Sequence, residues 1–388
     1  MTAAVVDRRG RPVAACERRE SCAVCGDRRL RPMLELPRVP VHMGCTHRPA
    51  DDDAFADQRW ARCRHCGCLQ LSALAPLDLV YQSQHNGAVG GVWARHHEAL
   101  VALLASHGPR QVVEVGGASG ALARRYVDAH GAVAWTVVEP NPTFVPQQPV
   151  RLVTAFVEDA VETVRPADMI VHSHLLEHLY LPRAFLTTMR AHARTGTLMV
   201  LSVPDLAALL DRAGANALNF EHTYYFGIPT LLWMLQDAGF AVEAMTRFER
   251  HSVFVTAVAE GDPGRAGHPP DADPGAHAFA RFIAQSRRDA VALTARAEAF
   301  TGDVYLFGGH VFSQFLLGCG FPEGRVTAVL DNDPAKDGLR LYGTDLTVVP
   351  PAVVGATPGP AAVIVRAAHY TAEITQQLRA LAPTAEIW

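Results

Sequence analysis

Short apolar runs and amphipathic stretches alternate through the middle of the chain, from about residue 92 onward. An apolar run of about four to eight residues is typical of a buried strand, and apolar residues recurring every three to four positions are typical of a helix that covers a sheet. The alternation therefore predicts an α/β domain with a parallel sheet. The apolar runs are residues 111–115, 134–138, 169–172 and 197–202, and the helical stretches include 122–129 and 182–193.

The segments on either side of this domain have different patterns. Residues 1–80 have little helical period and many arginines, cysteines and prolines, which is typical of a small module that needs a metal to fold. Glycine, proline and aspartate dominate residues 261–275, so we expect a linker there. An amphipathic helix at 277–300 and a βαβ pattern at 304–330 then predict a second, smaller Rossmann-like domain. The expected boundaries are 1–85 for the N-terminal module, 86–260 for the central domain, 261–275 for the linker and 276–388 for the C-terminal domain.

Length and charge narrow the function classes. At 388 residues the chain exceeds the size at which one hydrophobic core stops growing, which agrees with several domains. The formal net charge is only −4, so no strong field attracts a nucleic-acid polymer, and we expect a small-molecule substrate. No apolar run reaches the length of about 18 residues that a membrane span needs, and the first residues lack the apolar core of a signal peptide. We therefore expect a cytoplasmic protein without a membrane partner, as a monomer or small homo-oligomer.

A glycine-rich turn follows the first strand of the central domain and begins a helix. Its glycines let the backbone bend tightly and approach a ligand, and the helix start offers unpaired N–H donors. Such a turn also suits a dinucleotide, but the pattern E-x-G-x-x-x-G departs from G-x-G-x-x-G and resembles the first motif of class I methyltransferases. There the acidic residue orients the methionine end of S-adenosylmethionine. This motif comprises Glu114, Gly116, Gly117 and Gly120.

Polar residues at the ends of the following strands extend this predicted cofactor site. Glu139, followed by Pro140, ends the next apolar run at the place where a carboxylate accepts hydrogen bonds from ribose hydroxyls. Asp159 is placed to accept from the adenine amine, although a surface acid suits that position equally. His174 follows the run at 169–172, at the edge where open α/β sheets place their chemistry.

Two Cys-x-x-Cys pairs in the N-terminal module, each followed by glycine, resemble zinc knuckles. In a reducing compartment such pairs hold metal more often than they form disulfides. Four thiolates leave no open coordination position, so a zinc ion held by them is structural. Cys68 and His65 are alternative ligands. The predicted ligands are Cys22, Cys25, Cys63 and Cys66.

The order of these parts resembles the bacterial sugar C-methyltransferases, which act on nucleotide-linked keto-deoxysugars in antibiotic pathways. The resemblance spans nearly the whole chain, and it implies an N-terminal zinc-binding module that contacts substrate, a class I methyltransferase core with a Rossmann-like α/β fold, and a second C-terminal Rossmann-like domain. It includes three further fragments: Leu79-Val-Tyr81 leading to Gly87 and His96, Glu221-His222-Thr-Tyr-Tyr225-Phe226, and Asp331-Asn-Asp333-Pro-Ala-Lys336-Asp-Gly338.

In that family a base removes a proton from the carbon beside a ketone, and another group stabilises the enolate before carbon attacks the methyl group. The resemblance implies that His222 is the base and that Glu221 orients it or binds substrate. It implies that His178 contacts the substrate or the enolate. An O- or N-methyltransferase that uses His222 to deprotonate a hydroxyl or amine is the alternative, and a non-catalytic scaffold protein is a second one.

The chain departs from the family around the methyl acceptor. Asn219 stands where the family commonly has tyrosine, which would move that chemistry to Tyr224 or Tyr225. We expect Asn219 to contact an unusual acceptor. A Tyr-x-Tyr-x-Ser-Ser segment that shapes the family's substrate pocket reads here as Tyr81-Gln-Ser83-Gln-His85-Asn86. We expect substrate contacts from Tyr81, His85 and Asn86, with His85 alternatively a surface residue.

The C-terminal domain contains a turn that is too degenerate for a dinucleotide fingerprint. By resemblance this domain closes over the nucleotide part of the substrate. Gly308, Gly309 and His310 would then meet its phosphates through backbone donors. The alternative is a purely structural duplicate of the central domain.

Overall fold

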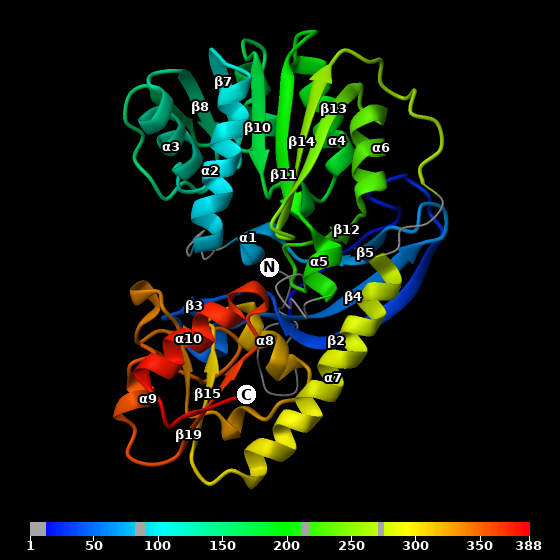
Figure 1. The fold of residues 1–388 in the computed structure, drawn as a ribbon. Coiled ribbons are helices and arrows are strands. Elements are labelled where there is room, and N and C mark those ends of the chain that lie inside the picture. Colours follow the sequence, from blue (N-terminus) through cyan, green and yellow to red (C-terminus); the bar gives the residue numbers. More distant parts are fainter. Residues whose placement is uncertain (1–12, 82–90, 212–217, 271–274) are drawn as a thin grey trace.

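The structure is a computed structural model, and it describes residues 13–81, 91–211, 218–270 and 275–388. His85 and Asn86, which we predicted to contact substrate, lie outside the described residues. Figure 1 shows the central domain above, the C-terminal domain below, and the N-terminal module along one side of both. No helix in these described ranges is long and apolar enough to cross a membrane.

The N-terminal module is built on an antiparallel sheet with the order β12-β5-β4-β2. Its strand β12 (Tyr224–Tyr225) comes from the central part of the chain, far from the others in sequence. The sheet therefore joins two regions that we predicted as separate domains. The remaining elements are β1 (Glu17–Arg18), β2 (Leu30–Pro40), β3 (Cys45–Thr46), β4 (Phe55–Cys63), β5 (Leu69–Leu71), β6 (Ala73–Leu74) and α1 (Leu77–Val80), with β1 paired to β6.

The central domain contains a seven-stranded sheet with the order β13-β14-β11-β10-β7-β8-β9. Strands β9, β8, β7, β10 and β11 are parallel, and β14 is antiparallel to both of its neighbours. The strands are β7 (Gln111–Val115), β8 (Ala134–Val138), β9 (Val150–Val153), β10 (Met169–Ser173), β11 (Leu198–Pro204), β13 (Phe240–Phe248) and β14 (Ser252–Ala259). The helices are α2 (Gly91–Ser106), α3 (Ala121–His130), α4 (Pro182–His192), α5 (Leu206–Asp211) and α6 (Ile228–Asp237).

Alternate side chains of the central strands pack on opposite faces of the sheet. Val112 and Val171 join one buried cluster with α2 and α3, whereas Val113 and Ile170 join another with α4 and α6. Figure 1 shows these two helical layers on either side of the sheet. Because both faces are covered, the parallel strands are apolar almost throughout, which explains the runs in the sequence.

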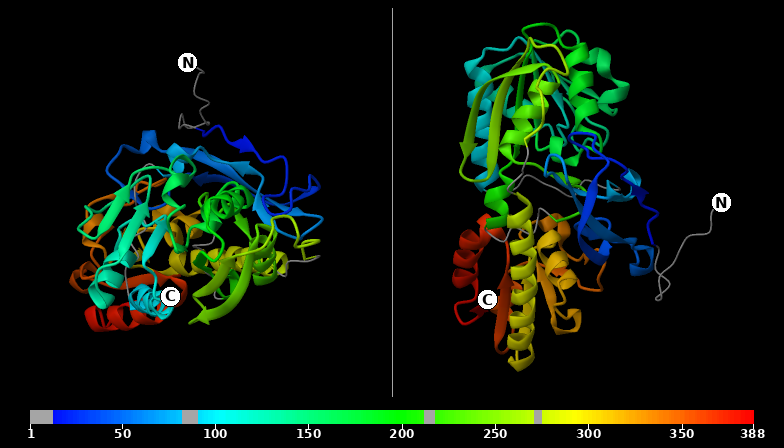
Figure 2. Two further views of the ribbon diagram at one scale, coloured as in Figure 1. Left: turned by 90° about the horizontal axis from the view of Figure 1, so that it is seen from above. Right: turned by 90° about the vertical axis from the view of Figure 1, so that its right-hand side faces the viewer.

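The C-terminal domain has a parallel five-stranded sheet with the order β18-β16-β15-β19-β20. Helix α7 (Gly275–Ala299) runs from beside the N-terminal module in Figure 1 down along this domain, as the right view of Figure 2 shows. The remaining elements are β15 (Asp303–Phe307), α8 (Val311–Gly318), β16 (Ala328–Leu330), β17 (Arg340–Leu341), β18 (Val348–Val349), α9 (Val353–Ala356), β19 (Ala361–Val365), α10 (Thr371–Leu381) and β20 (Glu386–Ile387).

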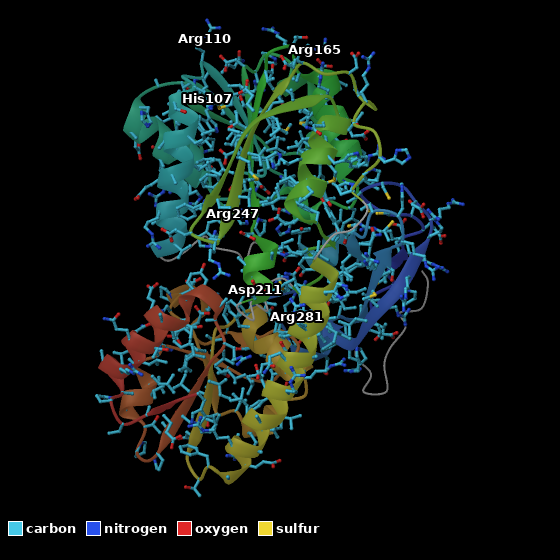
Figure 3. The ribbon with its side chains drawn as sticks, turned by 45° about the vertical axis from the view of Figure 1, so that its right-hand side comes forward. His107, Arg110, Arg165, Asp211, Arg247 and Arg281 are labelled. Carbon is cyan, nitrogen blue, oxygen red and sulfur yellow. The ribbon has the colours of Figure 1, made fainter. Side chains whose placement is uncertain are left out.

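The carboxyl ends of the central strands face the C-terminal domain. Arg110 and Arg165 precede strands β7 and β10, and Figure 3 shows both at the far edge of the molecule. Arg247, near the end of β13, lies at the waist between the two domains. The edge that carries the chemistry in open α/β sheets is therefore the one that meets the second domain.

The predicted fold class is confirmed. Two apolar runs coincide with β7 and β8, and the long amphipathic helix predicted at 277–300 is α7. The core is an α/β fold with helices on both faces of its sheet, followed by a second α/β domain. The antiparallel pair β13 and β14 makes the central sheet mixed where we expected a parallel one.

A buried ion pair fixes the N-terminal module to the C-terminal domain. Asp53 is fully buried and accepts hydrogen bonds from both terminal nitrogens of Arg340, at 2.6 and 2.9 Å, and from the Gly343 amide at 2.8 Å. Beside it, β17 pairs with β3. Removing one partner of such a pair leaves the other charge buried without compensation.

We predict that Asp53→Ala lowers the free energy of unfolding by about 3–5 kcal/mol, since it strands the Arg340 guanidinium. Urea-induced unfolding measures the change. The matched control is Asp57→Ala, which removes a half-exposed carboxylate beside Arg59 and should cost at most about 1 kcal/mol. Equal losses in the two variants would contradict this prediction.

Candidate active site and cysteine cluster

The glycine-rich turn between β7 and α3 has a backbone that only glycine adopts comfortably. Gly116 and Gly120 have φ angles of 77° and 64°. A Cβ atom at Gly117 would lie 2.5 Å from Val137 and 3.2 Å from the Glu114 carboxyl group. The turn therefore lies directly on the two strands, in a shape that suits close approach of a ligand.

Glu114 is buried beneath this turn. Its Oε2 accepts a hydrogen bond of 2.9 Å from the Trp135 indole. Burial raises the pKa of Glu114 to about 7, an effect that the Trp135 hydrogen bond opposes and the Glu139 charge reinforces. A cationic ligand group arriving above the turn would favour the ionised carboxylate.

Glu139 fixes the shape of the same turn. One oxygen accepts from the Ala118 amide at 3.0 Å and the other from the Asn141 amide at 2.9 Å. Pro140 follows at the partly exposed rim. The structure thus places Glu139 and Pro140 beside the turn, where the sequence predicts the ribose site.

The predicted adenine side of the site is open to solvent. Phe156 precedes a short helical turn, Val157–Asp159, and half of its surface is exposed. Asp159 is also exposed. An exposed aromatic ring beside an acceptor suits a planar base that carries an amino group.

A cluster of polar side chains lies at the carboxyl edge of the sheet. One ligand-type atom from each of Glu177, His178 and His222 lies within 4.8 Å of the other two. His178 Nδ1 lies 3.0 Å from the Tyr81 hydroxyl and 3.6 Å from Glu221 Oε2. The structure thus brings together four predicted residues: His222, Glu221, His178 and Tyr81.

His222 has the properties of a neutral base. Its Nδ1 is buried and has no hydrogen-bond partner in the described part of the chain. Burial, followed by the nearby His178, lowers the pKa of His222 well below its ordinary value, and Glu221 opposes this. Burial raises the pKa of Tyr81 well above its ordinary value, so its phenol stays protonated. His222 is therefore unprotonated at neutral pH and able to take a proton from a substrate, and the Tyr81 phenol is able to donate a hydrogen bond.

Asn219 holds the backbone of the turn that carries Glu221 and His222. Its Oδ1 accepts hydrogen bonds from the backbone amides of Glu221, at 2.7 Å, and His222, at 2.6 Å. This geometry closes the turn that presents both side chains. Asn219 therefore positions its neighbours, and the substrate contact that we predicted for it stays a prediction.

Glu177 received no role in the sequence analysis. Its carboxylate is fully buried, neither oxygen has a hydrogen-bond partner in the described residues, and Oε1 lies 3.4 Å from His174 Nδ1. His174 also pairs with Ser252 Oγ at 2.9 Å. The available signal was a carboxylate within an apolar run at the end of a strand.

The side chains of Tyr224 and Tyr225 are buried in the protein core. The Tyr224 hydroxyl donates to the Leu176 carbonyl, and its ring is fully buried in the core. Tyr225 packs against Trp60 and Phe279. Both residues form β12, and their side chains pack in the core around it. The phenol in contact with His178 is that of Tyr81.

At the start of α8, two of the three backbone donors that we expected for phosphates are engaged within the domain. The Gly309 amide donates to Asp331 Oδ2 at 2.8 Å, and the Gly308 amide donates to the Leu330 carbonyl at 2.7 Å. Both donors are already used within the domain. His310 is near enough to His222 to contribute to the lowering of its pKa, which places this turn beside the polar cluster.

The four predicted cysteines converge in the N-terminal module. Sulfur atoms of Cys22 and Cys66 are 3.5 Å apart, those of Cys25 and Cys63 are 3.6 Å apart, and all four lie within 4.8 Å. Four thiolates around zinc stand about 3.8 Å apart when Zn–S is about 2.3 Å, so the set fits this ion. Cys68 instead contacts the Tyr225 carbonyl at 3.3 Å.

Two family models match the chain. Residues 89–245 match a methyltransferase domain, and residues 273–386 match a C-methyltransferase C-terminal domain. The search of curated proteins gave no match.

Solved methyltransferase structures are distant likenesses. An O-methyltransferase family protein from Burkholderia thailandensis has 14% identity and a TM-score of 0.35 over 44% of this chain and 57% of its own. Human N-acetylserotonin methyltransferase, in complex with S-adenosylmethionine, has 14% identity and a TM-score of 0.37 over 44% and 53%. The 1,6-didemethyltoxoflavin-N1-methyltransferase of Burkholderia thailandensis has 19% identity and a TM-score of 0.32 over 43% and 78%. The chain spans only about half the length of the first two.

The fold and the domain match show that residues 89–245 form a methyltransferase domain with a class I α/β fold. The second α/β domain of the chain is a C-methyltransferase C-terminal domain, which supports membership of a C-methyltransferase family.

We predict that Glu114→Gln makes the ligand-free protein less sensitive to rising pH. Because the folded-state pKa is raised from about 4.5 to about 7, the stabilisation from the protonated form is complete below pH 4.5 and is lost as pH rises through 7. Glutamine keeps an acceptor for Trp135 and does not ionise. The variant should gain up to roughly 3 kcal/mol over wild type between pH 5 and pH 8.

Thermal unfolding at the two pH values measures this difference. Glu158→Gln, which alters an exposed carboxylate near the predicted adenine side, is the control. A Glu114→Gln profile parallel to wild type would refute the raised pKa.

Proposed function

We propose that the protein transfers the methyl group of S-adenosylmethionine to a carbon beside a ketone in a nucleotide-linked deoxysugar, with His222 as the base. The observation that carries this proposal is a neutral histidine at the carboxyl edge of a methyltransferase sheet, whose buried Nδ1 has no hydrogen-bond partner among the described residues. The C-methyltransferase C-terminal domain favours carbon as the acceptor atom. The family resemblance supports a sugar from natural-product biosynthesis, such as antibiotic biosynthesis.

The turn at 116–120 suits the methyl donor. A side chain at Gly117 would collide with Val137, so glycine lets the turn lie close against the strands and leaves its outer side to the cofactor. Glu114 faces the methionine end, Glu139 the ribose, and Phe156 with Asp159 the adenine. The Leu175 side chain contacts Gly116, so the turn adjoins the segment that carries His174 and His178. S-adenosylmethionine, when bound, supplies an electrophilic methyl group.

Proton removal falls to His222 and its neighbours. The α-proton moves to a ring nitrogen of His222, and Glu221 stabilises the imidazolium, as its effect on the His222 pKa indicates. The carbon then bonds to the methyl group as the S–CH3 bond breaks, which leaves S-adenosylhomocysteine. The proton on His222 is released to solvent afterwards.

Tyr81 and His178 are suited to hold the enolate oxygen. We infer that the protonated Tyr81 hydroxyl, 3.0 Å from His178 Nδ1, donates to that nitrogen, which would put the histidine proton on Nε2. His178 then donates from Nε2 to the developing negative charge. Donors aimed at such a charge in a dry site act more strongly than in water.

The C-terminal domain is the proposed holder of the nucleotide. It faces the carboxyl edge, and His310 lies near His222. Since the Gly308 and Gly309 amides are engaged, side chains such as His310 would make the contacts there.

We also propose that Cys22, Cys25, Cys63 and Cys66 bind a structural zinc ion. The converging sulfur atoms and the positive φ of the glycine after each pair support this. A closed thiolate site has no position for a substrate.

We predict that a nucleotide-linked keto-deoxysugar fully deuterated beside the ketone loses one deuterium per methyl group transferred. Mass spectrometry of the product measures the loss, and a reaction without enzyme corrects for spontaneous exchange. Full retention of deuterium, with a methyl group added, would refute C-methylation and indicate transfer to oxygen or nitrogen.

In the same assay, His222→Gln should reduce kcat by roughly 10²–10⁴-fold, which is the usual contribution of a general base. Affinity for S-adenosylhomocysteine should stay within about twofold. His130→Gln, at an exposed position on α3, is the matched control.

We predict that Cys63→Ser lowers the zinc content by one ion per chain and leads to aggregation, because folding of such modules depends on the metal. Elemental analysis of purified protein measures the zinc. Cys16→Ser, outside the cluster, should keep the full content. Wild-type protein without zinc would overturn the assignment.

A further inference from the structure

Three histidines from separate parts of the central domain meet at the carboxyl edge of its sheet. His96 belongs to α2, His174 follows β10, and His251 lies in the hairpin between β13 and β14. One ring nitrogen from each lies within 4.8 Å of the other two. None of the three is needed for the base or the glycine-rich turn described above.

The three rings form a nearly equilateral triangle. Their centroids are 5.4 Å apart for His96 and His174, and 5.6 Å apart for each of the other two pairs. Three imidazoles bound tetrahedrally to zinc, with Zn–N of about 2.0–2.1 Å, place their ring centres about 5.2 Å apart. The distances between these ring centroids thus differ by only a few tenths of an ångström from those of a three-histidine metal site.

Two of these histidines have one ring nitrogen held from outside. His96 Nε2 pairs with Ser202 Oγ at 2.9 Å, whereas its Nδ1 is buried and has no hydrogen-bond partner in the described ranges. His174 Nδ1 faces the Glu177 carboxylate at 3.4 Å. Metal-bound histidines characteristically donate their second nitrogen to a carboxylate or another acceptor, which fixes the ring.

Backbone and packing hold the cluster in this shape. His174 has a φ of 51°, a conformation that a non-glycine residue keeps only when its surroundings enforce it. The Trp93 ring covers all three histidines, with centroid distances of 4.8–5.1 Å. The Ser252 hydroxyl lies between His174 Nε2, at 2.9 Å, and His251 Nδ1, at 2.6 Å, so it ties these two rings together and a bound metal ion would take its place.

We propose that His96, His174 and His251 bind one divalent transition-metal ion of the zinc type. Neutral imidazoles suit zinc, cobalt, nickel and copper, and three protein ligands leave a fourth position open. The buried Glu177 carboxylate is then the outer partner of His174. This site is distinct from the four cysteines and does not depend on the proposed methyl acceptor.

Calorimetric titration of Co²⁺ into purified protein, with zinc retained at the cysteines, tests the proposal. Wild type should take up one Co²⁺ per chain, and His96→Gln and His251→Gln should each weaken that binding at least about 100-fold. The control His107→Gln lies at the opposite edge of the domain, as Figure 3 shows, and should bind like wild type. Co²⁺ should also quench the fluorescence of wild type more than that of Trp93→Phe, because Trp93 covers the site.

Binding of S-adenosylhomocysteine shows that each variant is folded, and His251→Asn replaces any variant that is not. Loss of Co²⁺ binding with this affinity retained supports the site. Wild type that binds no Co²⁺, or folded variants that bind it as wild type does, would overturn the proposal. Neither result depends on which acceptor is methylated.

Discussion

The pairing of β12 with β5 is the constraint on which the polar cluster depends. This two-residue strand begins two residues after His222, and its partner β5 begins three residues after Cys66. Additional contacts fix the same segment, since the Thr223 amide donates to the Glu177 carbonyl at 3.1 Å. The position of His222 against His178 is therefore set by a sheet of the N-terminal module, not by the central sheet alone.

This arrangement gives the cysteine cluster a role in the site without any contact with substrate. Metal at the four sulfur atoms would fix β5, β5 fixes β12, and β12 fixes the turn that Asn219 closes. The buried Arg19 adds to this, because its guanidinium donates to the carbonyls of Thr223 and Tyr180. If the N-terminal module loosens, His222 should therefore be displaced before the central sheet changes.

The sequence predicted those features that depend on residues close together in the chain. The first two apolar runs have the same bounds as β7 and β8, and the spacing of the glycines indicated the turn after β7. Tyr224 was assigned to catalysis because β12 is too short to have a period, and its pairing is with a strand about 150 residues away. The meeting of His96, His174 and His251 is likewise non-local. The positioning role of Asn219 could not be predicted, because hydrogen bonds between a side chain and the backbone leave no pattern in a single sequence.

The burial of so many neutral groups fits the charge change in the proposed reaction. An enolate and a sulfonium combine to give two uncharged products, so the separated charges attract more strongly in a medium of low dielectric. A base that is charged at rest would weaken this advantage, and burial keeps His222 neutral. The C-terminal domain brings His310 to the same edge. The second domain thus contributes to the chemistry by its position, even though its turn offers no free backbone donors at Gly308 and Gly309.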